Sequence, residues 1–419
     1  MSRSANCELI REAFENKIAD FAGSRYAVLC SSGRTAILYS LLALGIKAEH
    51  EVVIPDYSCQ ILPVTVFCTG AKPKFCDIER NTIALSLASL SKILNRKTKA
   101  VILIHPFGIP VDPTPFLEIT QEKGIALVED AAQAIGATIR GRKTGSFGDV
   151  GIFTFNKFLD VTSGAAAVTD SREIAKKVKL IRRALETKSF FASICYHMLD
   201  FLGSESKKLV HSVFSGDNYL HQLLRVKFAK KRFRVVGGWV EIGPIADEIR
   251  NSKALTNALM AYSGIQKNYT RRKLETLEIS ILESEFENLE KYLQERESLA
   301  KFYEANLKLK EGCLTKIYVP EHSTPSYMRY PILFSDERRR SICINNLFKL
   351  GYAIDYTYEP LHTSPFFSLE SRSLPLSESI YLSKHLLPLP MRPSLSQSDV
   401  ERITSVINSS AIPTEIIES

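Results

Sequence analysis

The stretch VGIFTFNKFLDVTSGAAAVT, residues 150–169, holds two apolar runs separated by a lysine that stands between two phenylalanines. The runs at 150–155 and 165–169 have the length and composition of buried strands. No helix fits between them, so we expect these two strands to depart from a parallel arrangement. Lys157 directly follows the first run, where burial of an ammonium group is costly. The position requires either a route to solvent or a chemical role.

The chain before this stretch repeats the pattern of apolar strands with helices between them. Further apolar runs occupy residues 27–30, 52–55, 73–78, 100–105 and 125–130, and helical patterns occupy 34–46, 60–70 and 116–124. Strands that are apolar on both faces predict an α/β fold with a mostly parallel central sheet and helices on both faces. Ligands of such sheets bind beyond the carboxyl ends of the strands, so the residues after each strand are candidates for a site.

The composition is that of a globular chain. The 419 residues are 45% hydrophobic and 24% charged, with a formal net charge of +8, which suggests two or three domains. The eight cysteines include no CxxC pair and no metal-type spacing, so we expect reduced, buried thiols and no metal site. The polar N-terminus differs from a signal peptide, and no apolar run approaches the roughly 20 residues of a membrane span. These features predict a cytoplasmic protein.

The chain divides into three predicted parts. Residues 1–254 form a large domain with a basic helical insertion at about 185–245, residues 255–310 form a long helical connection, and residues 311–419 form a small α+β domain. The small domain is predicted to contain a strand near 327–334, a helix at 337–351, a strand at 352–358 and a closing helix at 394–409.

Basic and aromatic residues are interleaved between positions 176 and 234. We favour a solvated insertion that covers the active site or a subunit interface. The alternative is a surface that docks on anionic lipid or nucleic acid. No nucleic-acid partner is expected, and peripheral membrane contact remains open.

Three groups of residues at strand ends indicate chemistry. In SSGRT, residues 31–35, amides at a helix start can bind an anion, although for this stretch alone an ordinary serine N-cap with a glycine turn is the favoured explanation. Asp130, which lies between Glu129 and Gln133, either caps a helix or holds a proton on a heteroaromatic nitrogen. Lys157 either reaches solvent or, within a dry pocket, has the neutral amine that a Schiff base requires. Together these groups predict a pyridoxal phosphate (PLP) pocket.

Several longer motifs point the same way. They are SSGRTAILYSLLALGI, EVVIPDYSCQ, GAKPKFCDIE, VILIHPFGIPVD, VEDAAQAIGATIRGRKTGSFGDVGIFTFNKF and LLPLPMRPSLSQSDVERI. Over nearly the whole chain, the sequence resembles the PLP-dependent sugar aminotransferases of the DegT/DnrJ/EryC1/StrS family, which have fold type I. The resemblance implies that Lys157 is the internal-aldimine lysine, Asp130 the pyridinium partner and Gln133 its neighbour on the ring. It also implies that Thr154 contacts the phosphate.

The resemblance extends to the phosphate site and to the assembly. Gly33 and Arg34 match the family's amide-donating Gly-Thr pair, and Thr35 belongs to the same helix start. Asn251 and Lys253 resemble the family's Asn-x-Arg segment, which reaches the phosphate of a neighbouring subunit. This implies a homodimer with shared active sites.

The sequence also departs from the family pattern. Cys59 stands where many members carry a phenylalanine or tryptophan over the cofactor, and the nearest aromatic residue is Tyr57. Arg34 replaces a threonine, and alanines replace glycines at 165–167. A related dehydratase subgroup has histidine in place of the lysine, so Lys157 favours transamination.

The resulting hypothesis is an aminotransferase that moves an amino group from glutamate or glutamine to a nucleotide-linked keto-sugar by a ping-pong mechanism. Polysaccharide or glycolipid assembly is the usual setting of the family. Candidate substrate contacts are His105, Arg329, Tyr330 and His362, each of which also has a structural explanation. The alternatives are a non-catalytic protein of the same fold that docks through its basic insertion, and a PLP enzyme of another reaction type.

Overall fold

The computed structural model describes residues 3–186, 234–236, 239–241, 273–309, 312–352, 354, 357–364, 367, 376–392 and 394–411. Most of the predicted basic insertion, together with Asn251 and Lys253, lies outside these residues. Besides residues 185 and 186 at its start, the described part of the insertion comprises two antiparallel strands, β10 (Arg234–Val236) and β11 (Trp239–Glu241), where the sequence predicts a helix.

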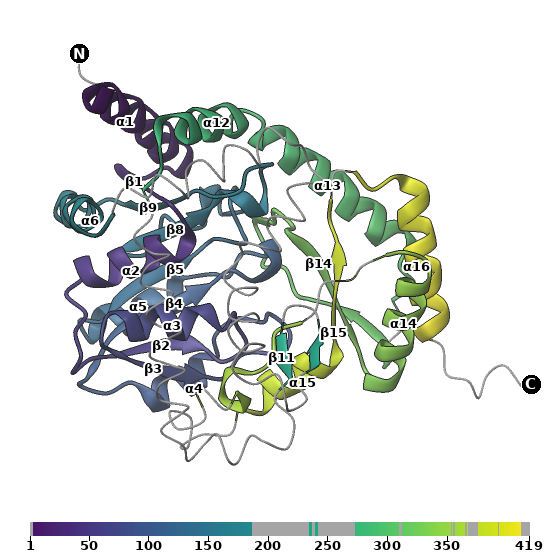
Figure 1. The fold of residues 1–419 in the computed structure, drawn as a ribbon. Helices are drawn as coiled ribbons and strands as arrows, with labels where there is room; N and C mark the ends of the chain where they lie inside the picture. The colour runs from purple at the N-terminus through teal and green to yellow at the C-terminus, as the bar shows by residue number, and fades with distance from the viewer. Residues whose placement is uncertain are drawn as a thin grey trace, which may run out of the picture.

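A seven-stranded sheet with the order β1-β9-β8-β5-β4-β2-β3 forms the centre of the large domain (Figure 1). Its strands are β1 (Tyr26–Cys30), β2 (Glu51–Pro55), β3 (Lys72–Cys76), β4 (Thr98–Ile104), β5 (Ala126–Asp130), β8 (Val150–Thr154) and β9 (Ala165–Thr169). β2, β3, β4, β5 and β8 pair in parallel, whereas β9 is antiparallel to both β1 and β8. The predicted mostly parallel sheet is confirmed, including the exception expected for its last two strands.

Helices cover both faces of this sheet, as predicted. They are α1 (Arg3–Ala22), α2 (Gly33–Ala43), α3 (Ile61–Cys68), α4 (Leu87–Ile93), α5 (Thr114–Glu122) and α6 (Arg172–Leu185). α2, α3 and α6 pack on one face, and α1, α4 and α5 pack on the other. Successive strand residues alternate between the two cores, so Val28 faces α2 while Leu29 faces α1.

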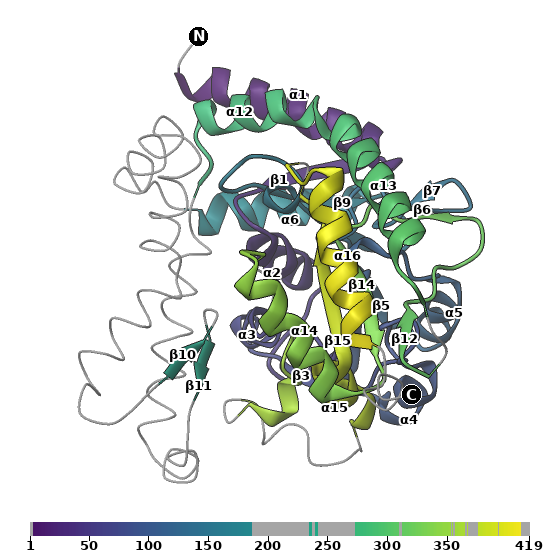
Figure 2. The ribbon, with the colours of Figure 1, turned by 90° about the vertical axis from the view of Figure 1, so that its right-hand side faces the viewer.

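Two helices connect the large domain to the small one. α12 (Thr276–Phe286) packs beside α1, and the two lie side by side in both views (Figures 1 and 2). α13 (Leu289–Asn306) begins against the large domain, and its Tyr303 is buried in the core of the small one. Each helix thus has an apolar face because it completes a core.

The small domain is built on an antiparallel sheet of β12 (Leu314–Lys316), β14 (Arg329–Phe334) and β15 (Leu386–Pro390). α14 (Glu337–Lys349) and α16 (Gln397–Ala411) pack on it with α13, and α15 (Ser377–His385) precedes β15. A short sheet of β13 (Ser323–Thr324), β6 (Thr138–Ile139) and β7 (Arg142–Lys143) links the domains.

The strand predicted at 352–358 is wrong, because the described residues of that segment belong to no strand. Its place in the sheet is taken by β15, whose sequence LLPLP contains two prolines. Proline disfavours a strand assignment because it cannot donate to the ladder, but β15 is an edge strand, where this loss is tolerated.

None of the described helices is long and apolar enough to cross a membrane. Cys7, Cys30, Cys76 and Cys343 are buried, whereas Cys59 is exposed, and the described cysteines form no disulfide.

Candidate active site

The acidic pair at the end of β5 divides into a structural residue and a candidate chemical one. Successive strand residues point to opposite faces, so Glu129 and Asp130 serve different sides of the sheet. Glu129 is fully buried and accepts hydrogen bonds from the amides of Gly145, Phe147 and Gly148 at 3.0, 2.6 and 2.7 Å. Glu129 therefore anchors the GSFG loop and is not presented to a ligand.

His105 completes this buried network. The amide of Val111 donates to His105 Nδ1 at 3.0 Å, and Nε2 lies 3.1 Å from Glu129 Oε2, so Nε2 is the protonated nitrogen. Burial alone would raise the pKa of Glu129, but the hydrogen bond from His105 and the loop amides hold this pKa below its usual 4.5. His105 is fully buried with both nitrogens engaged, which fits the structural explanation rather than a substrate contact.

Two glycines let the GSFG loop lie directly on the strands that carry the site. A Cβ atom on Gly148 would come within 2.6 Å of the Leu127 carbonyl oxygen, and one on Gly151 within 1.7 Å of the Gly145 carbonyl oxygen. Backbone atoms cannot retreat from such an approach without moving a strand. The glycine spacing in GSFGDVG is therefore set by the packing that fixes the ends of β5 and β8.

Asp130 and Gln133 lie at the carboxyl end of β5, as predicted. Asp130 is partly exposed, and its Oδ1 accepts the amide of Ala132 at 3.0 Å, an Asx-type turn that fixes the direction of the carboxylate. Gln133 is buried. Its Oε1 accepts the amide of Phe107 at 2.9 Å, and its Nε2 donates to the Tyr358 hydroxyl at 3.0 Å. Gln133 thus joins three segments around Asp130.

The start of α2 and the end of β8 close on each other. A Cβ atom on Gly33 would stand 2.6 Å from Thr154 Oγ1. Ser32 caps the helix, because its Oγ accepts the amide of Thr35 at 3.3 Å while Thr35 Oγ1 donates to the Ser32 carbonyl oxygen at 2.6 Å. Amides at the very start of a helix have no acceptor within it, and the helix end is positive. Beside the Thr154 hydroxyl and the partly exposed Arg34, they form an anion cradle.

Lys157 ends the 3₁₀ helix η2 (Phe155–Lys157), directly after β8. Phe155 and Phe158 are buried, whereas the Lys157 side chain is exposed. In the described part of a single chain, the lysine therefore reaches solvent, and the dry pocket considered from the sequence does not enclose it. Its carbonyl oxygen accepts a hydrogen bond from Arg296 Nη2 at 3.4 Å, which ties η2 to α13.

Tyr57 is buried, and its ring lies 5.6 Å from that of Tyr358 in an edge-to-face arrangement. Burial raises the pKa of Tyr57. Cys59 is exposed at the position where many family members carry an aromatic residue. Tyr57 thus packs into the protein rather than replacing that aromatic residue at the surface of the site.

Tyr358 is a site residue that the sequence reasoning missed. It is partly exposed, its ring stacks on Phe107 with the centroids 6.3 Å apart, and its hydroxyl accepts from Gln133. Burial, followed by the charges of Cys59, Tyr57 and Asp130, raises the pKa of Tyr358. The YEPLH segment was the available signal.

The other candidate substrate residues come from the small-domain part of the chain. Arg329 and Tyr330 are adjacent in β14 and point to opposite faces. Tyr330 is buried and stacks with Tyr303 and Tyr327 at centroid distances of 5.5 and 5.6 Å, so its place is in the core. Arg329 is partly exposed at the junction between the domains.

His362, in the 3₁₀ helix η3 (Leu361–Thr363), is bound to the end of β2. Its Nδ1 lies 2.7 Å from Asp56 Oδ2, and its amide donates to Oδ1 at 2.9 Å. Asp56 is fully buried. The pair brings His362 to the carboxyl edge of the sheet and fixes the orientation of its ring.

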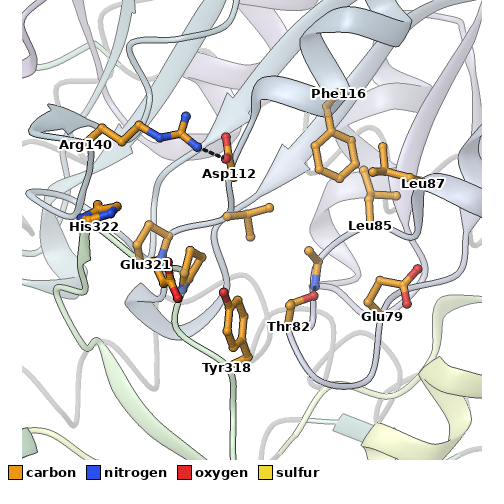
Figure 3. Close-up of a pocket in the computed structure, with 14 residues that line it drawn as sticks. Glu79, Thr82, Leu85, Leu87, Asp112, Phe116, Arg140, Tyr318, Glu321 and His322 are labelled. Atoms are coloured by element: carbon orange, nitrogen blue, oxygen red, sulfur yellow. Dashed lines mark hydrogen bonds and ion pairs between the residues drawn. The ribbon is translucent and has the colours of Figure 1, made fainter.

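A separate pocket of about 480 Å³ opens between the large domain and the segment at 318–322 (Figure 3). Leu85, Leu87 and Phe116 form its apolar side, and an ion pair between Arg140 and Asp112 at 3.0 Å lies across from them. The described residues that line it include none of the predicted site residues.

A model of the DegT/DnrJ/EryC1/StrS aminotransferase family matches residues 10–207 and 253–408. The chain belongs to this family. Members of the DegT/DnrJ/EryC1/StrS family are PLP-dependent aminotransferases, so the family, the enzyme class and the cofactor predicted from the sequence are confirmed.

Two relatives named as enzymes of sugar metabolism match over part of the chain. GDP-perosamine synthase of Caulobacter vibrioides is 35% identical over 171 residues, which cover 40% of this chain and 46% of that protein. UDP-N-acetyl-3-dehydro-alpha-D-glucosamine 3-aminotransferase of Acidithiobacillus ferrooxidans is 35% identical over 173 residues, 41% of this chain and 47% of that protein. The matches thus span about half the length of these curated relatives.

The fold matches over nearly the whole chain. The crystal structure of S. venezuelae DesV has a TM-score of 0.71 and 20% identity, and covers 97% of this chain and 90% of that one. At this identity the likeness concerns the fold alone, and it confirms fold type I.

The described residues of this DegT-family chain fit PLP. Because Gly33 has no side chain, the start of α2 lies close to the Thr154 hydroxyl, and the first-turn amides and this hydroxyl could donate to the same phosphate. Asp130 would accept a hydrogen bond from the protonated pyridine nitrogen, and the exposed amine of Lys157 is accessible to an aldehyde. Asn251 and Lys253, assigned to a neighbouring subunit's phosphate, lie outside the described residues.

Proposed function

We propose that this enzyme transfers an amino group from glutamate or glutamine to a nucleotide-linked keto-sugar. One observation carries the proposal. Lys157, Asp130 and the Gly33–Thr154 cradle lie at the same edge of the sheet. Lys157 follows β8, Asp130 ends β5, and the cradle lies between α2 and β8. The names of the relatives, which act on sugar derivatives, support the choice of acceptor.

The residues have distinct tasks in this proposal. The cradle binds the phosphate and sets the position of the cofactor, and PLP supplies an electron sink next to the reacting carbon. Asp130 holds a proton on the ring nitrogen, and Lys157 Nζ carries the cofactor and moves a proton between carbon atoms. Gln133 and Tyr358 fix the surroundings of Asp130 through their 3.0 Å hydrogen bond.

Donor and acceptor would both react at the one site that Lys157 serves. This supports a ping-pong order, in which the donor product leaves before the acceptor binds. We further propose a homodimer in which Asn251 and Lys253 complete the neighbour's site. The exposure of Lys157 in a single chain supports this arrangement, because a second subunit would shield the lysine from water.

The proposal is tested with PLP-loaded protein given L-glutamate or L-glutamine and a panel of nucleotide-linked keto-sugars. We expect 2-oxo acid to form in an amount equal to the enzyme without a sugar, and catalytically with the right sugar, whose aminated product is identified by mass spectrometry. The Lys157→Ala variant is the control and should form neither product. A loaded wild-type protein that deaminates no donor would contradict the proposal.

A further inference from the structure

Three arginines gather where the two domains meet. Arg296 lies on α13, Arg329 is the first residue of β14, and Arg392 follows β15 by two residues. Arg329 pairs in register with Pro390. Arg329 and Arg392 therefore lie at the same end of the small sheet, although they are 63 positions apart in the chain.

Two of these arginines are bound to the backbone beside Lys157. Arg296 Nη1 and Arg329 Nη1 both donate to the carbonyl oxygen of Met328, at 3.4 and 2.9 Å. Arg296 Nη2 also donates to the carbonyl oxygen of Lys157 at 3.4 Å. The shared acceptor places the two guanidinium groups next to each other. Because Arg296 also binds the Lys157 carbonyl oxygen, it fixes the position of this pair relative to Lys157.

Two guanidinium groups that share one acceptor repel each other, and an anion bound between them would relieve this repulsion. Arg296 is 6% exposed, and its Nε finds no hydrogen-bond partner among the described residues. Burial and then the charge of Arg329 lower the pKa of Arg296 to about 10. Burial and then the charge of Arg392 lower the pKa of Arg329. The junction is therefore a place of high positive potential, open to solvent at Arg392.

We propose that Arg329 and Arg392 bind the α-carboxylate of the amino donor. The inference rests on the proposed function and deepens it. The carboxylate is bonded to the carbon whose proton Lys157 Nζ moves, so it must lie close to that lysine. Arginine binds a carboxylate through two parallel N–H···O bonds, which fixes the orientation of the donor as well as its affinity.

Arg296 acts in this proposal as a positioning residue. Its guanidinium joins the backbone of Lys157 to that of Met328, next to Arg329. The anion cradle at Gly33 and Thr154 belongs to the large domain. The cofactor phosphate and the donor carboxylate are therefore bound by different groups, the phosphate by this cradle and the carboxylate by Arg329 and Arg392.

Phosphoryl groups of a nucleotide-linked sugar share the anionic chemistry of a carboxylate, and the experiment separates the two. The donor half-reaction of PLP-loaded protein is followed with L-glutamate, and the acceptor half-reaction with the sugar. Arg329→Gln should raise the half-saturating concentration of glutamate by roughly 10- to 100-fold, the loss of one charge-assisted interaction. Arg329→Lys should recover part of it. The half-saturating concentration of the sugar should change less than about twofold.

A second arm measures binding without turnover. Cofactor-free protein is titrated with 2-oxoglutarate and, separately, with UDP, in phosphate buffer that fills the cradle. Arg329→Gln and Arg392→Gln should each weaken 2-oxoglutarate and spare UDP. Arg338→Gln, an exposed arginine on α14, is the matched control and should change neither.

The outcomes are distinct. Unchanged glutamate and 2-oxoglutarate affinities in folded Arg329→Gln would overturn the inference, as would a loss confined to UDP or the sugar. If wild-type protein deaminates no donor, the proposed function fails. The 2-oxoglutarate titration then still decides whether the arginines bind a carboxylate.

Discussion

Replacing Gly33 with alanine should weaken PLP binding more than it weakens the fold. The added Cβ atom would stand 2.6 Å from Thr154 Oγ1, whereas ordinary contact begins at 3.4 Å. The backbone of Gly33 is outside the left-handed region, so alanine itself is tolerated there, and alanine favours a helix. The Thr154 hydroxyl must therefore retreat by roughly 0.8 Å or rotate out of the cradle.

The size of the effect follows from the lost hydrogen bond. A hydroxyl that donates to a charged phosphate contributes about 1.5–3 kcal/mol, so Gly33→Ala should raise the Kd for PLP by roughly 10- to 100-fold. Thr154→Ala removes the same hydroxyl and should have a similar effect. The double variant should be no weaker than either single variant, because the methyl group added at position 33 then meets no oxygen.

The assay is an equilibrium titration with PLP, paired with thermal unfolding of the cofactor-free variants. Thr169→Ala is the matched control, since Thr169 is a buried strand-end threonine whose Oγ1 donates to the Asp149 carbonyl oxygen at 2.6 Å. It should lower stability and leave PLP affinity unchanged. A wild-type affinity for PLP in Gly33→Ala, or additive losses of PLP affinity in the double variant, would refute the proposal that the cradle binds the cofactor phosphate.

Three further predictions concern the scaffold. Glu129→Gln should lower the free energy of unfolding by about 3–5 kcal/mol in urea, because a buried amide group would face N–H donors. The pKa of Glu129 lies below 4.5, so the contribution of its carboxylate to stability is complete above about pH 4.5 and is lost as the pH falls through the native pKa. The free energy of unfolding should therefore fall less steeply with acid in the variant than in the wild type. Equal slopes of unfolding free energy against pH in the two proteins would contradict this. Gly151→Ala should abolish soluble expression, because its Cβ atom would lie 1.7 Å from the Gly145 carbonyl oxygen, and a normal yield would disprove that packing. Tyr358→Phe should lower the free energy of unfolding by about 1 kcal/mol and shift the absorbance of bound PLP, since it removes the hydroxyl that accepts from Gln133. An unchanged spectrum would show that Tyr358 does not influence the cofactor site.

The central sheet was predictable from the sequence because its strands are apolar on both faces, and the absence of room for a helix before β9 gave its direction. The small sheet was not fully predictable. Pro388 and Pro390 make the sequence of β15 look unlike a strand. The sheet tolerates these prolines because β15 is an edge strand, and no local pattern reveals that position. Tyr352 and Tyr358 suggest a strand by composition, but their hydroxyls bond to Asp399 and Gln133 instead.

The site shows the same division between local and distant information. Asp130 and Thr154 end strands and Lys157 follows one, so their convergence at one edge could be predicted from the order of the chain. Arg296 and Tyr358 approach that edge from distant elements, 139 and 225 positions away from Lys157 and Gln133. Their roles depend on how the domains pack, and only the folded chain reveals them.

The central claim is that Lys157 carries the cofactor. PLP-loaded protein should be reduced with borohydride, digested and mapped by mass spectrometry. The account predicts a stable pyridoxyl label on Lys157, absent from Lys157→Ala. A label on another lysine, or no label on a folded protein that binds PLP, would contradict it.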